Sequence, residues 1–329
     1  MFRTILAGLL PGIAVAAVAA AQTSSPALIV LNKEDATLVI VDPASKKVLG
    51  RVATGEGPHE VAVSTDGKLA FVGNYGTGPA PGRTISVIDL VSQKELRRVD
   101  LGPLRRPHGI FFAGDDKVYF TAEVNRLVAR YDPSANQFDW MMGTGQAGTH
   151  MVLATRDVRK IFTANIGSDS ITVMERGDNP LVWNATVISV GKGPEAIDLS
   201  PDEKEIWTAH SRDGGVSIVD VGAKKVVHTL SLQTKRSNRL KFTPDGKLVL
   251  VSDLDAGELV IVDAPARKEI KRLKLGKSPE GILVAPDGAR AYVAVNGDNF
   301  VSIVDLKTLA ETGRIETGTG PDGMAWKNR

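Results

Sequence analysis

The sequence predicts an all-β protein made of repeated four-stranded units, on three observations. Val and Ile dominate the apolar runs and Gly is frequent, with 33 of 329 residues, a composition typical of many short strands joined by turns. A loop of the type Gly-Pro-His or Gly-Pro-Glu, followed by an apolar strand, recurs at intervals of about 40–50 residues. Turn sequences such as Ser-Thr-Asp-Gly separate the apolar runs.

The N-terminus has the features of an export signal. Arg3 supplies a positive charge, residues 5–20 are largely apolar, and Ala19-Ala20-Ala21 before Gln22 fits a small-x-small cleavage pattern. We therefore expect residues 1–21 to be a signal peptide and residues 22–329 to form a single mature domain, periplasmic or secreted. A permanent membrane anchor is the alternative, but the apolar run is short for a span.

Composition excludes several classes of site. The chain has no Cys, which excludes disulfides, thiolate metal sites and covalently attached c-type haem. The formal net charge is +2, so we expect no nucleic-acid partner. The sequence also contains no phosphate-binding glycine loop and no G-x-S-x-G motif.

Seven copies of the unit can be aligned. Complete copies begin at residues 57, 106, 148, 193, 236 and 278, and a truncated copy begins at 320. The first copy contains the strand-like runs EVAVS, KLAFVGN, TISVIDL and KELRRVDLG. The third run of a unit often ends in Asp, which we expect to start an Asx-type turn; these residues are Asp42, Asp89, Asp132, Asp220, Asp263 and Asp305. Four strands in a unit of about 40–50 residues are typical of a propeller blade.

The two ends of the chain complete one another. The C-terminus supplies only a first strand, GMAWK, and the mature N-terminus supplies the other three, ALIVLN, TLVIVDP and KVLGRVATG. Pairing them would close a ring and remove exposed sheet edges. The prediction is therefore a seven-bladed β-propeller with four antiparallel strands per blade, whose last blade is closed by the N- and C-terminal strands.

The second runs VYFTAE, IFTAN, IWTAH and AYVAVN resemble the Tyr-Val-Thr-Asn strand of the YVTN repeat. With the SPDG-like turns and the S-I-V-D third strands, the chain is similar to the YVTN/YncE-like seven-bladed β-propellers of bacterial periplasm and archaeal surface layers, over essentially all of the mature chain. That resemblance implies the fold. It selects no activity, because the same architecture occurs in lactonases, an antibiotic-opening lyase, nitrous oxide reductase and binding proteins.

Polar side chains recur at two equivalent positions of the units. The third residue of each unit is one of His59, His108, His150, Glu195, Asn238, Glu280 and Asp322. The end of each second strand carries one of Asn32, Asn74, Glu123, Asn165, His210, Asp253 and Asn296. The first strand of a blade lies nearest the axis and its neighbour runs antiparallel to it. We therefore expect both sets to surround one mouth of the central channel.

Four of the five histidines fall in these two sets. Imidazole and carboxylate groups that converge on a concavity suit a divalent metal such as Zn or Cu, or general acid–base chemistry. The candidate metal ligands are His59, His108 and His150. The candidate ligand-binding residues are these three with Glu195, His210, Glu280, Asp322, Glu123, Arg105 and Arg106. The arginines lie in connections between units, as do Lys192, Lys235, Arg236, Arg239 and Lys277, and arginine forks suit carboxylate or phosphate.

Several functions remain open at this point. The first is an exported protein that binds a small anionic molecule or a protein segment at the His/Glu-lined mouth, with or without a divalent metal. The second is a metal-assisted lactonase or lyase that uses the same site. The third is a non-catalytic scaffold that contacts partners through its rim, in which the polar residues only cap strands at a wet mouth. In each case we expect a monomer without a permanent membrane anchor after signal cleavage.

Overall fold

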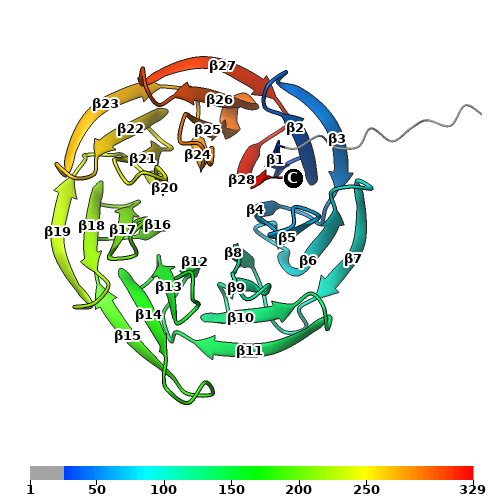
Figure 1. Cartoon of the computed structure of the whole chain (residues 1–329), viewed down its shortest axis with the longest axis vertical. Helices are drawn as coiled ribbons and strands as arrows, with labels where there is room; N and C mark the ends of the chain where they lie inside the picture. Colours follow the sequence, from blue (N-terminus) through cyan, green and yellow to red (C-terminus); the bar gives the residue numbers. More distant parts are fainter. Residues whose placement is uncertain (1–25, 329) are drawn as a thin grey trace, which may run out of the picture.

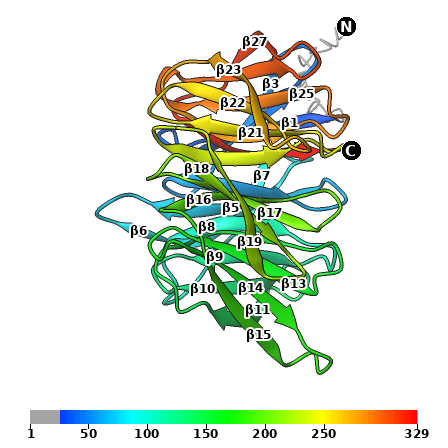
Figure 2. The ribbon, with the colours of Figure 1, turned by 90° about the vertical axis from the view of Figure 1, so that its left-hand side faces the viewer.

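The computed structural model describes residues 26–328, and the predicted signal peptide lies outside them. The described chain forms 28 strands in seven four-stranded antiparallel sheets. Figure 1 shows the seven sheets arranged as blades around a central axis, and Figure 2 shows the ring from its edge. The predicted seven-bladed propeller is confirmed. Within residues 26–328, no helix is long and apolar enough to span a membrane.

The strands fall into four positions by distance from the axis. The innermost strands are β4 (Pro58–Val63), β8 (Pro107–Phe112), β12 (Thr149–Ala154), β16 (Pro194–Leu199), β20 (Ser237–Phe242), β24 (Pro279–Val284) and β28 (Pro321–Lys327). The second strands are β5 (Leu69–Gly76), β9 (Val118–Ala122), β13 (Lys160–Asn165), β17 (Glu205–His210), β21 (Leu248–Asp253), β25 (Arg290–Val295) and β1 (Ala27–Asn32). We number blades 1 to 7 in the order of these innermost strands.

The outer two positions complete each blade. The third strands are β6 (Pro81–Asp89), β10 (Leu127–Asp132), β14 (Ser170–Arg176), β18 (Gly215–Asp220), β22 (Glu258–Asp263), β26 (Phe300–Asp305) and β2 (Thr37–Asp42). The outermost strands are β7 (Lys94–Asp100), β11 (Gln137–Gly143), β15 (Trp183–Ser189), β19 (Lys225–Ser231), β23 (Lys268–Lys274), β27 (Ala310–Glu316) and β3 (Lys47–Ala53). A short 3-10 turn, η1 (Asn296–Asp298), follows β25.

Blade 7 closes the ring as the sequence predicts. The C-terminal β28 pairs antiparallel with the N-terminal β1, so that Ile29 lies opposite Ala325 and Leu28 opposite Trp326. Leu28, Ile29 and Val30 are fully buried in this sheet. Because β28 pairs with β1, β1 is not left as an exposed edge strand where the ring closes.

Neighbouring blades share their apolar faces, which is why a single blade would not be stable alone. Between blades 4 and 5, for example, the ring of Trp207 packs edge-on against Phe242 with centroids 5.5 Å apart. The predicted Asx-type turns are present as well. Asp89 Oδ1 accepts the backbone N–H of Val91 at 2.7 Å, and Asp305 Oδ1 accepts that of Lys307 at 3.0 Å. These turns fix the geometry at which the outermost strand folds back.

Near the axis the backbones of successive blades approach closely. A Cβ atom on Gly281 would lie 2.1 Å from the carbonyl oxygen of Asp322, and one on Gly323 would lie 2.1 Å from that of His59. No larger residue fits at either position without a shift of the backbone. These glycines draw β24, β28 and β4 together and narrow the channel beside the polar residues of its mouth.

Candidate ligand site at the channel mouth

A bulge in every inner strand aims one polar side chain at the axis. The pairing between first and second strands shifts register around the third residue of each unit, for example between Pro58 and Glu60, and between Pro194 and Ala196. The same irregularity occurs in all seven sheets. A β-bulge leaves one residue unpaired and redirects its side chain. The repeat therefore places one polar group per blade at the mouth.

All seven of these side chains line one cavity of about 150 Å³. They are His59, His108, His150, Glu195, Asn238, Glu280 and Asp322. The other residues that line it are Lys33, Tyr75, Arg236, Arg239 and Leu254. The expected convergence of the third-position residues is thus present. Whether they bind a ligand stays a prediction.

One side of the cavity is a wall of imidazoles, which we call the imidazole wall: His59, His108 and His150 from blades 1 to 3. The ring centroids of His108 and His150 lie 3.6 Å apart, and those of His59 and His108 lie 5.2 Å apart. Burial lowers the pKa of His59 to about 4 and that of His108 well below its ordinary value. Both rings are therefore neutral at pH 7.

Several nitrogens of the imidazole wall have no hydrogen-bond partner within residues 26–328. These atoms are His108 Nδ1 and both ring nitrogens of His150. His150 Nδ1 lies 3.5 Å from Glu123 Oε2, which is longer than a good hydrogen bond. His59 differs, because its Nδ1 lies 2.8 Å from the carbonyl oxygen of Gly57. Buried polar atoms without partners are rare in native proteins and point to a missing ligand, ion or water.

Blades 6 and 7, the latter next to blade 1 in the ring, carry a wall of charges, which we call the charged wall: Lys33, Glu280 and Asp322. Lys33 Nζ lies 2.7 Å from Glu280 Oε2 and 3.4 Å from Asp322 Oδ2. Burial and the neighbouring Asp322 raise the pKa of Glu280 to about 7, although Lys33 opposes the shift. Burial opposes ionisation of Asp322, but Lys33 and Arg239 hold its pKa below the ordinary value.

An ion pair across the axis forms the floor of the cavity. Arg239 on β20 and Glu60 on β4 come from opposite sides of the ring (Figure 1), and Arg239 Nε donates to Glu60 Oε1 at 2.9 Å. Arg239 Nη1 also donates to the carbonyl oxygen of Asn238 at 3.2 Å. Arg239 was expected in a rim connection. The structure corrects this, because the residue lies within an inner strand and its side chain is buried.

The residues expected at the ends of the second strands mostly do not reach the cavity. Asn74 Nδ2 donates to Thr84 Oγ1 at 2.9 Å and holds strands of its own blade together. Glu123 lies behind the imidazole wall, where its Oε2 accepts the hydroxyl of Tyr75 at 2.8 Å.

The structure corrects the predicted position of His210. Its Nδ1 lies 2.8 Å from Asp213 Oδ1, and it lines a separate pocket of about 430 Å³ near β15 and β19. It therefore does not belong to the mouth cavity.

The two predicted arginines also lie outside the lining of the cavity. Arg105 Nη1 donates to the carbonyl oxygens of Gly102 and Leu104. Arg106 Nη2 donates to the carbonyl oxygen of Gly78 at 3.1 Å, and its guanidinium lies 4.6 Å from the ring centroid of Tyr75. Arg106 thus fixes the loop between β5 and β6, which projects from the disc in Figure 2.

Three residues that line the cavity were not predicted from the sequence: Lys33, Tyr75 and Leu254. Each directly follows a residue of the second predicted set, namely Asn32, Asn74 and Asp253. Successive side chains of an extended strand point in opposite directions. When the asparagine turns into the sheet, the next residue turns toward the channel.

The fit to a metal ion is incomplete. Neutral imidazole nitrogens are suitable ligands for Zn or Cu, and the free nitrogens of His108 and His150 are available. Within residues 26–328, however, no group of three or more His, Asp or Glu side chains is arranged to hold a metal ion. The metal centre of His59, His108 and His150 therefore stays a prediction.

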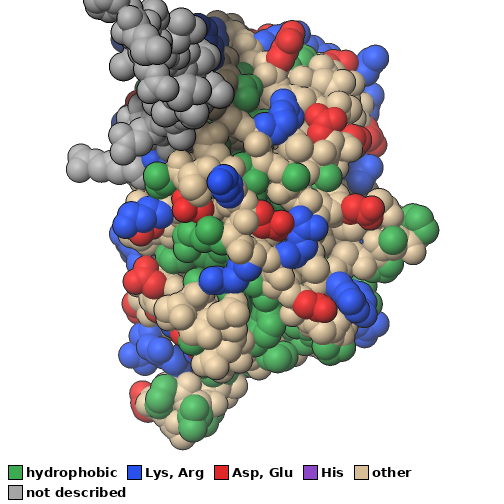
Figure 3. All heavy atoms as spheres, turned by 90° about the vertical axis from the view of Figure 1, so that its right-hand side faces the viewer, with side chains coloured by type: hydrophobic (Ala, Val, Ile, Leu, Met, Phe, Trp, Pro, Cys, Tyr) green, Lys and Arg blue, Asp and Glu red, His purple; other side chains and the backbone are tan. Residues whose placement is uncertain are grey.

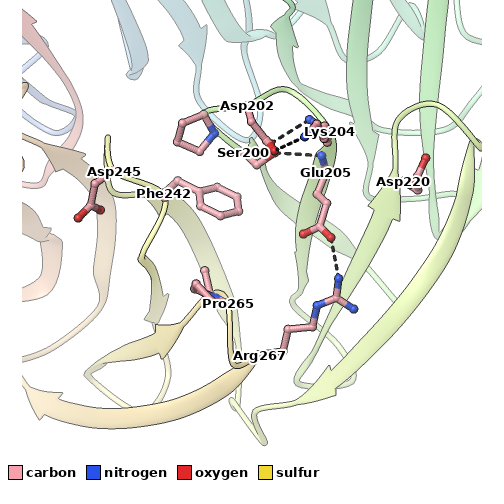
Figure 4. Close-up of a pocket in the computed structure, with 12 residues that line it drawn as sticks. Ser200, Asp202, Lys204, Glu205, Asp220, Phe242, Asp245, Pro265 and Arg267 are labelled. Atoms are coloured by element: carbon pink, nitrogen blue, oxygen red, sulfur yellow. Dashed lines mark hydrogen bonds and ion pairs between the residues drawn. The ribbon is translucent and has the colours of Figure 1, made fainter.

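A larger groove lies on the opposite face, where first strands turn into second strands. It has a volume of about 470 Å³ and lies between blades 4 and 5 (Figure 4). Its charged groups already have partners: Ser200 Oγ donates to Asp202 Oδ1 at 2.7 Å, and Arg267 Nη2 donates to Glu205 Oε1 at 2.6 Å. On the side of the ring in Figure 3, basic and acidic side chains are interspersed. Neither surface concentrates unpaired groups as the mouth does.

Two family models match parts of the chain. Residues 2–132 match the YNCE-like beta-propeller family, and residues 145–287 match the cytochrome D1 heme domain. The mouth cavity does not fit a haem, since its 150 Å³ is well below the roughly 300–1,000 Å³ of pockets for drug-sized ligands, and a haem is larger than those ligands. We therefore derive no haem chemistry at this site.

Two curated relatives align with part of the chain. Hydrazine synthase subunit beta of Kuenenia stuttgartiensis is 32% identical over 176 residues, which cover 41% of this chain and 46% of that protein. Antigen Lp49 of Leptospira interrogans is 26% identical over 162 residues, which cover 47% of this chain and 35% of that protein. The chain thus spans less than half the length of these relatives.

Solved structures match over nearly the whole chain. Hydrazine synthase of Kuenenia stuttgartiensis has a TM-score of 0.72 at 19% identity, with 91% of this chain and 99% of that chain covered. The periplasmic gluconolactonase of Pseudomonas aeruginosa has a TM-score of 0.75 at 18% identity, with 92% and 99% covered. At such identities the likeness shows the fold alone.

Proposed function

Because residues 2–132 match the YNCE-like beta-propeller family, whose fold fixes no single activity, we propose that the function of this chain resides in the mouth cavity. The protein is an exported binding protein that holds a small molecule there through an anionic group. The signal-like N-terminus supports export, and the periplasmic gluconolactonase among its structural neighbours is consistent with it.

One observation carries the proposal. The repeat brings seven polar side chains to one cavity, and the imidazole nitrogens of His108 and His150 that face this region have no partner within residues 26–328. A polar atom buried without a partner costs about 1–3 kcal/mol. A ligand that supplies those partners recovers that free energy, so the arrangement favours a binding site over a set of strand caps.

Thermal denaturation with small ligands tests this proposal. A ligand that binds only the folded protein raises Tm in proportion to the logarithm of its concentration above Kd. We expect small carboxylates and amino carboxylates to raise the Tm of the untagged mature protein. The combined change His59→Ala, His108→Ala and His150→Ala should abolish the rise.

The matched control is His228→Ala, which changes an exposed histidine on the outermost strand β19 and should leave the rise intact. The proposal is wrong if the triple variant folds, as judged by circular dichroism, and still responds like the wild type.

A metal-assisted enzyme is the second candidate. The free nitrogens of His108 and His150 favour it, as does Glu280, whose pKa near 7 suits a general acid or base. Several structural neighbours are named as lactonases, including a putative 6-phosphogluconolactonase from Bacteroides uniformis. Elemental analysis of the untagged protein should then find about one Zn or Cu per chain, and lactone hydrolysis should depend on it. If no metal is found and none binds, this candidate is eliminated.

A further inference from the structure

Some of the charged side chains that line the mouth cavity already form ion pairs within the protein, and others do not. Of the cations, Lys33 is paired with Glu280 and Asp322, and Arg239 is paired with Glu60. Arg236 lies at the exposed rim of the same cavity, and its hydrogen bonds are made by its backbone: its N–H donates to Asp253 Oδ1 at 3.0 Å and its carbonyl oxygen accepts the N–H of Leu254 at 2.9 Å. Within residues 26–328 its guanidinium has no carboxylate or carbonyl partner. It is therefore the cation of the cavity that is free for an anionic group.

The free acceptors lie deeper. Asp322 is almost completely buried, and its Oδ1 has no hydrogen-bond partner in the described chain. Arg239 Nη2 lies 3.9 Å from that oxygen, too far for a hydrogen bond. Asp322 Oδ1 therefore requires a ligand that brings a hydrogen-bond donor. An uncharged imidazole has one acceptor nitrogen and one N–H, so His150, with both nitrogens free, can accept one hydrogen bond from such a ligand and donate another.

The charges of the cavity favour a ligand that carries both signs of charge over a simple anion or a simple cation. Four carboxylates, those of Glu60, Glu195, Glu280 and Asp322, line or floor the site, against the three cations Lys33, Arg236 and Arg239. A ligand with only negative charge would enter a site without excess positive charge. A ligand with only positive charge would leave Arg236 unpaired. A ligand that carries both charges satisfies both ends.

The volume limits the size of the ligand. The cavity volume of about 150 Å³ is well below the roughly 300–1,000 Å³ of pockets for drug-sized ligands. Such a space holds a molecule of a few heavy atoms rather than a sugar chain or a peptide segment.

Building on the proposed function, we propose that the mouth cavity binds a small zwitterion, an amino carboxylate of the size of glycine, alanine or serine. The carboxylate pairs with Arg236 at the rim, where the planar guanidinium can donate two parallel hydrogen bonds. The ammonium group lies inward and donates to Asp322 Oδ1 and to an acceptor nitrogen of His108 or His150. No bond is made or broken.

Calorimetric titration of the mature protein tests this assignment with five probes: glycine, L-alanine, acetate, methylammonium and Zn²⁺. We expect glycine or alanine to bind at least about tenfold more tightly than acetate or methylammonium, because only the zwitterion satisfies both ends of the cavity. Arg236→Gln should weaken zwitterion binding at least about tenfold. Lys235→Gln, which removes a neighbouring exposed charge outside the cavity, should leave it unchanged.

Asp322→Asn keeps the size of the side chain and should also weaken the zwitterion at least about tenfold, with little effect on acetate. If acetate binds as tightly as glycine, the assignment of a zwitterion is wrong, but the proposed binding of an anionic group still holds. Binding of Zn²⁺ alone overturns the zwitterion and supports the metal-assisted candidate. If the protein binds none of the five probes, the assignment of a zwitterion is wrong. If small carboxylates and amino carboxylates also fail to raise its Tm, the proposed function is wrong as well.

Discussion

The imidazole wall and the charged wall line adjoining parts of the same cavity but are built in opposite ways. In the imidazole wall, burial keeps His59 and His108 neutral, and nitrogens of His108 and His150 stay unpartnered. In the charged wall, Lys33 keeps its charge beside two carboxylates, although Asp322 Oδ1 has no hydrogen-bond partner in the described chain. One repeat position thus holds imidazoles in blades 1 to 3 and carboxylates paired with Lys33 in blades 6 and 7.

The largest effect is expected at the floor that joins the two sides. Arg239→Met would leave Glu60 without its buried counter-charge, and removal of one member of a buried pair typically costs about 3–5 kcal/mol. Urea denaturation at pH 7 measures the loss. The control is Arg98→Met, which breaks the exposed pair with Glu95 and should cost about 0–1 kcal/mol. Equal losses in the two variants would mean that the pair across the axis contributes no more than a surface pair.

The charged wall should become less stable as pH rises. The pKa of Glu280 is raised to about 7 in the folded protein, above its ordinary value of 4.5, so the folded state binds the proton more tightly. The contribution of Glu280 to stability is therefore present below about pH 4.5 and lost as pH rises to about 7. Glu280→Gln should remove this loss, on the order of 2–3 kcal/mol, and flatten the pH profile of unfolding free energy between pH 4.5 and 7. An unchanged profile would mean that Glu280 ionises normally.

His59 in the imidazole wall should show the opposite trend. The pKa of His59 is lowered to about 4 from an ordinary 6.5, so the unfolded state binds the proton more tightly. Stability is therefore present above pH 6.5 and lost as pH falls toward 4. His59→Asn, which installs the residue found at the equivalent Asn238, should reduce this acid loss by on the order of 2 kcal/mol. A steeper acid loss in the variant would contradict the burial of a neutral ring.

Sequence alone predicted the fold and much of the cavity, since both follow from the repeat. The bulge recurs with the repeat, so His59, Glu195 and Asp322 could be expected at one mouth without knowledge of any contact. The neighbours of the second set could not be assigned in the same way, because the alternation along a strand decides whether Asn74 or Tyr75 faces the channel. His210 was wrongly predicted at the mouth for this reason.

The ion pair between Glu60 and Arg239 could not be predicted from the sequence, for a different reason. The two residues occupy the same position of the repeat but lie 179 residues apart in the sequence. Five of the seven blades carry Gly, Ala or Met there, so the pattern of the repeat gives no reason to pair blade 1 with blade 5. Only the closed ring brings them face to face.

The most direct test of the binding cavity is a titration of the five histidine Cε1–H signals by NMR, with glycine added to the untagged mature protein. The account predicts that the signals of His59, His108 and His150 move with a common saturation curve, while those of His210 and His228 stay in place. If the three signals of the imidazole wall do not move, or if all five move together, glycine does not bind in the mouth cavity and the account is contradicted.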